Sequence, residues 1–222
     1  MLRVGLTGSI AVGKSFVASV LAKLGCHVLD ADQTARETVA AGTPGLRAVV
    51  ENFGREVLRA DGTLDRATLG AIVFADEGQR LLLNSILHPF IIAAQDEQLR
   101  RWEEMDARGI AVVDAALMIE SGGYKRFDKL IVVHCRPDAQ LRRLMERNGL
   151  TQEEAAKRIA SQMSQEEKKR YADYLIDTSE GFIKTEQETE QVYRALREVE
   201  AAMADHKDAA GREDAQSLNK DA

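Results

Sequence analysis

The sequence contains few cysteines, prolines and aromatic residues, and no long apolar run. Its 222 residues include two cysteines, three prolines and one tryptophan. Cys26 and Cys135 are too few for a disulfide framework in a chain of this length, and their spacing matches no metal or redox motif. No stretch reaches about 18 consecutive apolar residues, the length that a membrane-spanning helix needs. The sequence therefore predicts neither a disulfide-stabilised secreted domain nor a transmembrane protein.

The charge balance argues against a further class of partner. The chain carries 30 Lys and Arg against 36 Asp and Glu, a formal net charge of −6, which makes no electrostatic case for wrapping nucleic acid. A local basic patch can still bind an anionic substrate. The first residues, MLRVGLTGS, already read as part of the folded domain, so no signal peptide is expected. We therefore expect a cytoplasmic protein, a monomer or weak homo-oligomer, with small-molecule partners, no nucleic acid and no membrane.

Short apolar runs alternate with helical patterns along the chain. Strands are predicted at residues 2–6, 27–29, 110–113, 129–133 and 174–176, and helical segments at 15–24, 33–105, 138–169 and 184–203. The first strand, the first helix and the second strand form a right-handed βαβ unit, so a parallel sheet flanked by helices is expected. Residues 205–222 are polar and are predicted to form a disordered tail.

One motif dominates the sequence. Residues 8–15, GSIAVGKS, match G-x-x-x-x-G-K-[ST] in full, between a predicted strand and a predicted helix. In such a loop the backbone N–H groups and the helix amino terminus attract phosphate, and Gly8 and Gly13 let the backbone approach closely. Lys14 reaches the β- and γ-phosphates and the Ser15 hydroxyl binds Mg²⁺. The motif predicts ATP and Mg²⁺ binding, and the lack of a guanine-reading Asn-Lys-x-Asp segment in the predicted domain favours a small-molecule kinase.

Acidic residues end two of the predicted strands. Asp30 and Asp32 close the second strand and Asp114 closes the third. Ligand sites of parallel sheets gather at the carboxyl ends of the strands, so these carboxylates are expected near the phosphate loop. A carboxylate there can take a proton from an attacking hydroxyl or hold Mg²⁺ through water. The alternatives are that Asp32 caps the following helix and that Asp30 and Asp114 are ordinary strand-end acids.

Arginines gather in the charged helical stretch. Arg143 and Arg147 are four residues apart and share a helix face. On a mobile lid, such a pair can clamp the phosphoryl group during transfer. The alternative is a solvated face in which these arginines pair with glutamates such as Glu146.

Over roughly residues 1–180 the sequence resembles the dephospho-CoA kinase family, the last enzymes of coenzyme A synthesis. Each matching fragment is weak alone, but the ordered set is specific. The fragments are LTGSIAVGKS at 6–15, VLDAD at 28–32, DGTLDR at 61–66, LHPFI at 87–91, QLRRLMER at 140–147, Arg158-Ile159 with Gln162, and ADYLID at 172–177.

The sequence departs from the family pattern at a few positions. Residues 116–120, ALMIE, stand where the family often has Pro-Leu-Leu-Phe-Glu, and loss of the proline should loosen that turn. Thr178 replaces the asparagine of an Asp-Asn pair. Ser9 and Ala11 replace glycines in the phosphate loop. The motif G-x-x-x-x-G-K-[ST] accepts any residue at these two positions, so nucleotide binding should be retained.

The resemblance implies an α/β P-loop nucleotide-kinase fold in a single domain of residues 1–204. Its core would comprise residues 1–34, 106–137 and 171–204, with a helical substrate-binding insertion at about 35–105 and a lid at about 138–170. ATP would bind through residues of the phosphate loop and the start of the first helix. These residues would be Gly8, Ala11, Val12, Gly13, Lys14, Ser15 and Phe16.

The resemblance also implies a reaction. The ribose 3′-hydroxyl of dephospho-CoA would attack the γ-phosphate of ATP to give coenzyme A and ADP, with Asp32 as base or hydroxyl-orienting group. Lys14, Arg143 and Arg147 would stabilise the transferring phosphoryl group. The substrate would contact Asp32, His88, Leu117 and Glu120, and Mg²⁺ would be held by Ser15, with Asp30 and Asp114 acting through water.

Three alternatives stay open beside this assignment. His88 reads equally well as a buried structural histidine. The chain as a whole is also compatible with another small-molecule P-loop kinase, such as a nucleoside monophosphate kinase. A third possibility is a non-catalytic regulator that binds nucleotide; the intact Lys14, Ser15 and Asp32 argue against it.

Overall fold

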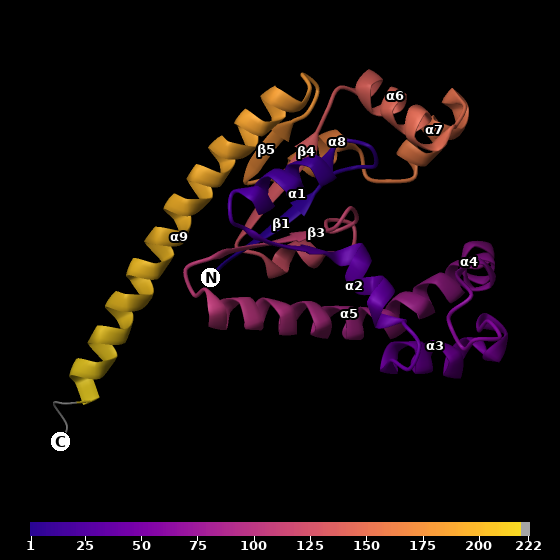
Figure 1. Cartoon of the computed structure of the whole chain (residues 1–222), viewed down its shortest axis with the longest axis horizontal. Helices are drawn as coiled ribbons and strands as arrows, with labels where there is room; N and C mark the ends of the chain where they lie inside the picture. Colours follow the sequence, from indigo (N-terminus) through magenta and orange to yellow (C-terminus); the bar gives the residue numbers. More distant parts are fainter. Residues whose placement is uncertain (219–222) are drawn as a thin grey trace. The chain divides into compact units, whose positions relative to one another are not determined.

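The computed structural model describes the backbone of residues 1–218 and the side chains of residues 1–205, and residues 219–222 lie outside the described part. The chain divides into two compact units. One comprises Met1–Leu29 and the described residues from Trp102 onward, and the other comprises Asp30–Arg101. Figure 1 shows the helices and strands in chain order. The domain limits expected from the sequence stay a prediction.

A five-stranded sheet forms the framework of the first unit. Its strands are β1 (Leu2–Thr7), β2 (His27–Asp30), β3 (Ile110–Asp114), β4 (Lys129–His134) and β5 (Tyr174–Asp177), in the spatial order β2-β3-β1-β4-β5. Strand β1 pairs in parallel with β3 and β4, and β4 pairs in parallel with β5. All five predicted strands are confirmed, and each ends one residue later than predicted. Because parallel strands end at a common edge, the segments that follow β1, β3, β4 and β5 meet there.

The central strands are buried on both faces, as their unbroken apolar sequences predict. Val4 of β1, Val112 of β3 and Ile131 of β4 have no exposed surface. They share one core with Leu21 and Leu196, which belong to the helices that flank the sheet. Burial of each such side chain contributes roughly 1.5–3 kcal/mol, so this core fixes the helices to the sheet.

Helices α1 (Lys14–Lys23) and α9 (Phe182–Leu218) pack against each other, and α9 also contacts β1, β3 and β5 (Figure 1). Helix α9 continues beyond the predicted end at residue 203. Of the predicted tail, residues 205–222, the structure describes the backbone to Leu218 as part of α9, and the rest lies outside the described residues. The expectation that residues 205–222 form a disordered tail stays a prediction. Among the described residues, none of the helices is long and apolar enough to cross a membrane.

Three helices follow β4, where the lid is predicted. They are α6 (Pro137–Asn148), α7 (Gln152–Ala160) and α8 (Gln165–Lys169). Local sequence signals begin two of them. Thr151 with Glu154 forms a capping box at the start of α7, and Ser164 with Glu167 forms another at the start of α8. Each box satisfies backbone N–H groups that the first helical turn leaves without partners.

The second unit is helical and has a core of its own. Its elements are α2 (Ala31–Thr38), α3 (Pro44–Phe53), the short 3₁₀ helix η1 (Arg55–Val57), α4 (Arg66–Ala75) and most of α5 (Glu77–Met105). The core consists of Val39, Leu46, Val49, Phe53, Val57, Leu64 and Leu69. His88 lies within α5, and its side chain is exposed. The interpretation of His88 as a buried structural histidine is therefore wrong.

Candidate active site

The phosphate loop connects the end of β1 to the start of α1. Ala11 and Gly13 both have left-handed backbone conformations, with φ of 60° and 89°. At Gly8, a Cβ atom would lie 2.5 Å from the carbonyl oxygen of Val133, so a side chain there would collide with β4. Gly13 is the N-cap of α1, and within the described structure no side chain caps this end. The helix amino terminus is therefore open to an anion, as a phosphate-binding loop requires.

Side chains from the predicted lid hold the backbone of this loop. The Ile10 N–H donates to Oε1 of Gln162 at 2.8 Å, and the Ile10 carbonyl accepts from Nε2 of Gln140 at 2.8 Å. The Ser9 hydroxyl donates to the carbonyl of Met163 at 3.2 Å. These bonds fix the backbone of the loop at Ser9 and Ile10.

Lys14 and Asp114 form an ion pair at the centre of the site. The ammonium nitrogen of Lys14, at the start of α1, contacts Oδ1 of Asp114, at the end of β3. The register of the sheet explains the contact, because Asp114 pairs with Leu6, two residues before Gly8. Asp114 is thus close to the phosphate loop, as the strand-end pattern predicts, and its described contact is with a lysine.

The two lid arginines have different surroundings. Arg143 donates to the Thr178 hydroxyl at 2.8 Å and to the Thr178 carbonyl at 2.6 Å. That hydroxyl in turn donates to the carbonyl of Val12 at 2.6 Å, which links Arg143 to the phosphate loop through one residue. Arg147 is exposed, and its Nε donates to the side-chain oxygen of Asn148 at 3.0 Å. The structure therefore brings Arg143, but not Arg147, to the loop.

Asp30 and Asp32 also differ in their surroundings. The carboxylate of Asp30 accepts from the N–H groups of Asp32 and Gln33 at 2.8 and 3.1 Å, and so it caps α2. The capping role considered for Asp32 therefore belongs to Asp30, because the helix begins at Ala31, earlier than predicted. The Asp32 side chain is exposed, and its carboxylate has no hydrogen-bond partner among the described residues.

The segment after β3 carries Leu117 and Glu120. Leu117 is exposed over 52% of its surface, so its side chain can contact a ligand. The carboxylate of Glu120 instead forms an ion pair with Lys168 at 2.8 Å. Lys168 is a polar residue of the site that the sequence analysis missed. It lies in a run of charged residues, QEEKKR, where nothing local distinguishes a buried lysine from solvated ones.

A cavity of about 660 Å³ opens beside the phosphate loop, lined by Ser9, Gln140 and Gln162 and by the ends of β4 and β5. Burial, reinforced by the charge of Lys169, holds the pKa of His134 below its ordinary value. The pKa of Asp177 is also lowered: burial opposes the shift, but hydrogen bonds from Ser179 outweigh it. The cavity lies within the size range of small-molecule sites, roughly 300–1,000 Å³.

The described residues offer Mg²⁺ some oxygen ligands but not a complete set. The Ser15 side chain is exposed at the second position of α1, next to Lys14. The described residues contain no cluster of three or more His, Cys, Asp or Glu side chains arranged to hold a metal ion. Such a donor set fits Mg²⁺ that arrives with a nucleotide, because Mg²⁺ usually keeps its waters and takes most other ligands from substrate phosphates.

A phosphate loop at the carboxyl end of a central parallel strand, with a lysine and a strand-end aspartate in contact beside it, defines a P-loop nucleotide-binding enzyme. Residues 2–184 match the family model of dephospho-CoA kinase. The chain belongs to the dephospho-CoA kinase family. This confirms the resemblance that the ordered sequence fragments indicate.

Individual relatives agree. The dephospho-CoA kinase of Listeria monocytogenes serotype 4b (strain F2365) is 45% identical over 187 residues, which cover 83% of this chain and 92% of the relative. That of Streptomyces avermitilis is 44% identical over 177 residues, 80% of this chain and 85% of the relative. Among solved structures, the dephospho-CoA kinase of Campylobacter jejuni superposes with a TM-score of 0.68 at 29% identity, over 88% of this chain and 97% of that one. A crystal structure from Thermus thermophilus gives a TM-score of 0.76 at 28% identity, with the same coverage. The α/β fold with its parallel sheet is confirmed.

Proposed function

We propose that this chain transfers the γ-phosphoryl group of ATP to the ribose 3′-hydroxyl of dephospho-CoA, giving coenzyme A and ADP, by means of the residues described below. Dephospho-CoA kinase activity, the last step of coenzyme A biosynthesis, is the activity of its family. The observation that carries the assignment of residues is the intact phosphate loop with Lys14 beside Asp114. Family membership favours dephospho-CoA over a nucleoside monophosphate as the acceptor.

The phosphate loop and the start of α1 bind the nucleotide in this proposal. The open amino terminus of α1 and the left-handed turn at Ala11 and Gly13 support the role, because they leave backbone N–H groups available to phosphate oxygens. Lys14 exchanges its contact with Asp114 for the β- and γ-phosphates, or shares it with them. The nucleotide-binding residues are Gly8, Ala11, Val12, Gly13, Lys14, Ser15 and Phe16.

Asp32 orients the acceptor hydroxyl or takes its proton. Two observations support this assignment: its carboxylate is exposed, and Asp30 already provides the cap of α2. A loose phosphoryl-transfer transition state needs little base assistance, so positioning of the hydroxyl is the larger part of this role. His88, Leu117 and Glu120 are the further acceptor-binding residues of the proposal, and the exposure of His88 and Leu117 is compatible with contact to a ligand.

Charge that develops on the transferring phosphoryl group is stabilised by Lys14, Arg143 and Arg147. Arg143 has the stronger structural support, because Thr178 connects it to Val12 of the loop. Mg²⁺ would be held by Ser15 and, through water, by Asp114 and Asp30, and it would neutralise charge on the β- and γ-phosphates. Asp30 has the weaker support of the two acids, since its carboxylate caps α2.

An assay of ADP release with alternative acceptors tests the function. Purified full-length chain is incubated with ATP, Mg²⁺ and either dephospho-CoA or a panel of nucleoside monophosphates. We expect acceptor-dependent ADP release with dephospho-CoA alone, and a product that carries its new phosphate on the ribose 3′-oxygen. Release with a nucleoside monophosphate but not with dephospho-CoA would contradict the proposal, and nucleotide binding without turnover would indicate a regulator. A cytoplasmic location and a monomeric or weakly oligomeric state stay predictions.

A further inference from the structure

Lys168 is buried to a degree that is unusual for a lysine. Its side chain has no exposed surface, and it is the largest fully buried side chain among the described residues. Lysine is almost never fully buried unless its charge is paired. Lys168 lies on α8, whose capping box orients this helix of five residues. The local sequence thus determines where α8 begins, whereas the groups that surround the Lys168 side chain come from segments far away in the chain.

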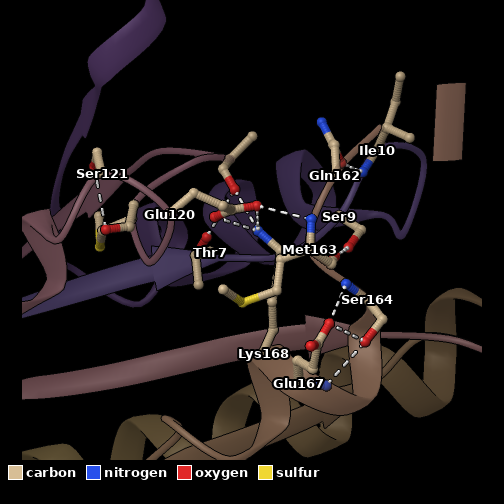
Figure 2. A network of polar contacts seen from close by, with 12 residues as sticks. Thr7, Ser9, Ile10, Glu120, Ser121, Gln162, Met163, Ser164, Glu167 and Lys168 are labelled. Carbon is tan, nitrogen blue, oxygen red and sulfur yellow. Dashed lines mark hydrogen bonds and ion pairs between the residues drawn. The ribbon is translucent and has the colours of Figure 1, made fainter. Parts of the chain in front are cut away.

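The ammonium group of Lys168 reaches the segment that follows β3. It donates to the carbonyl of Ala116 at 2.8 Å and forms an ion pair with Glu120, with distances of 2.8 and 2.9 Å to the two carboxylate oxygens (Figure 2). The carbonyl of Ala116 also accepts from the Thr7 hydroxyl at 3.1 Å. Residue 116 is the position where the family often has proline. Two hydrogen bonds thus hold a turn that the proline would otherwise restrict.

The same contacts continue to the phosphate loop. Oε1 of Glu120 accepts from the N–H of Met163 at 3.3 Å, and the carbonyl of Met163 accepts from the Ser9 hydroxyl. Figure 2 shows Lys168 and Glu120 on one side of Met163 and Ser9 on the other. Three segments are therefore linked: the turn at residues 115–121, the return of the lid at 162–164 and the phosphate loop.

We propose that Lys168 is a positioning residue that holds the acceptor-binding turn, which carries Leu117 and Glu120, in register with the phosphate loop. The proposal rests on the function proposed above. Stability alone gives a poor reason for such a pair, because well-packed apolar residues often replace a buried ion pair without loss of stability. An ammonium with three donors, by contrast, fixes the direction of each partner. Misplacement of a reacting group by about 1 Å can reduce the rate on the order of 10²-fold.

Substitution of Lys168 by methionine, which keeps an unbranched chain one atom shorter and removes the charge, tests the proposal. Wild-type enzyme is assayed first, so that a failure of the proposed function is seen separately. For K168M we expect a fall in kcat/KM for dephospho-CoA on the order of 10²-fold, with a raised KM for that substrate. ATP binding, measured directly by calorimetry, should change by no more than about threefold, since Lys14 and the α1 terminus are untouched.

Two controls separate positioning from stability. Lys157, on α7, pairs with Glu153 and keeps 75% of its side chain exposed, so K157M should behave as wild type. Leu196 has no exposed surface and lies on α9 in the main core, so L196A lowers stability without touching the linked segments. If K168M loses no more activity than L196A at a similar loss of melting temperature, Lys168 is merely structural.

A milder variant keeps the test decisive if K168M does not fold. Thr7→Val removes the second donor to the Ala116 carbonyl in a side chain of nearly the same shape. We expect several-fold weaker apparent binding of dephospho-CoA, unchanged ATP affinity and an unchanged melting temperature. An unchanged KM for dephospho-CoA in T7V would overturn the proposal that the hold on Ala116 positions the acceptor.

Discussion

The ammonium group of Lys14 contacts the carboxylate of Asp114, although the two residues are 100 positions apart in the sequence. Their side chains keep only 17% and 11% of their surfaces exposed, so water screens the attraction weakly. A triphosphate on the loop would compete with Asp114 for the same ammonium. The pair therefore keeps the lysine directed toward the carboxyl ends of β1 and β3.

Replacement of Lys14 should abolish most turnover. Lys14→Ala removes a preorganised positive charge that the transition state needs. We expect kcat to fall by more than about tenfold, which corresponds to about 1.4 kcal/mol, while the circular dichroism spectrum stays native. Lys23→Ala, at the exposed end of the same helix, is the matched control and should keep wild-type kcat. A folded K14A variant with a tenth or more of wild-type kcat would contradict the role of Lys14.

Asp32 and Asp30 should respond differently to substitution. Asp32→Asn cannot hold a negative charge, so kcat should fall by roughly 10²–10⁴, nearer the lower end, with little change in ATP affinity. Asp30→Ala removes the α2 cap and should lower the free energy of unfolding by about 1 kcal/mol. Comparing kcat, ATP affinity and denaturation of the two variants checks both assignments. Near-normal kcat in D32N would show that Asp32 is not the catalytic carboxylate.

Substitutions of the two lid arginines, Arg143 and Arg147, should lower kcat by unequal amounts. Arg143 is linked through Thr178 to the phosphate loop, whereas Arg147 bonds only to exposed Asn148 among the described residues. We expect Arg143→Gln to lower kcat by roughly 10²–10³, the usual effect of removing one transition-state donor. Arg147→Gln should cause the smaller loss. Steady-state kinetics on both variants decides the order, and a larger loss for R147Q would mean that the lid rearranges around that residue during turnover.

Ala11 occupies a backbone conformation that favours glycine. At φ of 60°, a side chain costs about 1–2 kcal/mol, while glycine adds unfolded-state entropy worth about 0.4–1 kcal/mol. Ala11→Gly should therefore leave the protein as stable as wild type or slightly more stable. Ala22→Gly, in the exposed last turn of α1, should lower stability by roughly 0.5–1 kcal/mol. Urea denaturation of both variants makes the comparison, and equal destabilisation would rule out strain at Ala11.

Protonation of His134 should lower the stability of the fold in mild acid. Burial, followed by the charge of Lys169, lowers its pKa, although Asp177 and Glu166 oppose the shift. The unfolded chain therefore binds a proton at higher pH than the folded protein does. The free energy of unfolding falls as the pH drops below about 6.5, and this residue has no effect above that range.

His134→Asn tests this sign. The variant lacks the group that titrates, so it should lose less stability than wild type when the pH is lowered from about 8 to about 5.5. Chemical denaturation at both pH values provides the measurement. His88→Asn, which changes an exposed histidine, is the control and should follow the wild-type pH dependence. Parallel losses in wild type and H134N would refute the assignment.

Several features of the fold follow directly from local sequence. Each strand is a short apolar run, and burial of the central strands on both faces gives such runs a clear pattern. The phosphate loop is a contiguous motif whose spacing suffices to identify it. Helix starts are harder to predict: α2 begins at Ala31, so its cap is Asp30, two residues before the expected cap at Asp32.

The sequence by itself determined the α/β class, the phosphate loop and, through an ordered set of fragments, the family. It did not determine which charged side chains meet. Lys14 with Asp114, and Lys168 with Glu120, are pairs separated by 100 and 48 residues, and only the parallel register and the packing of α8 bring them together. Nor did helical spacing separate Arg143 from Arg147, because partners outside the helix decide where each guanidinium bonds. A local pattern reports the preferences of neighbouring residues, whereas the burial of a charge depends on atoms contributed by segments far away in the chain.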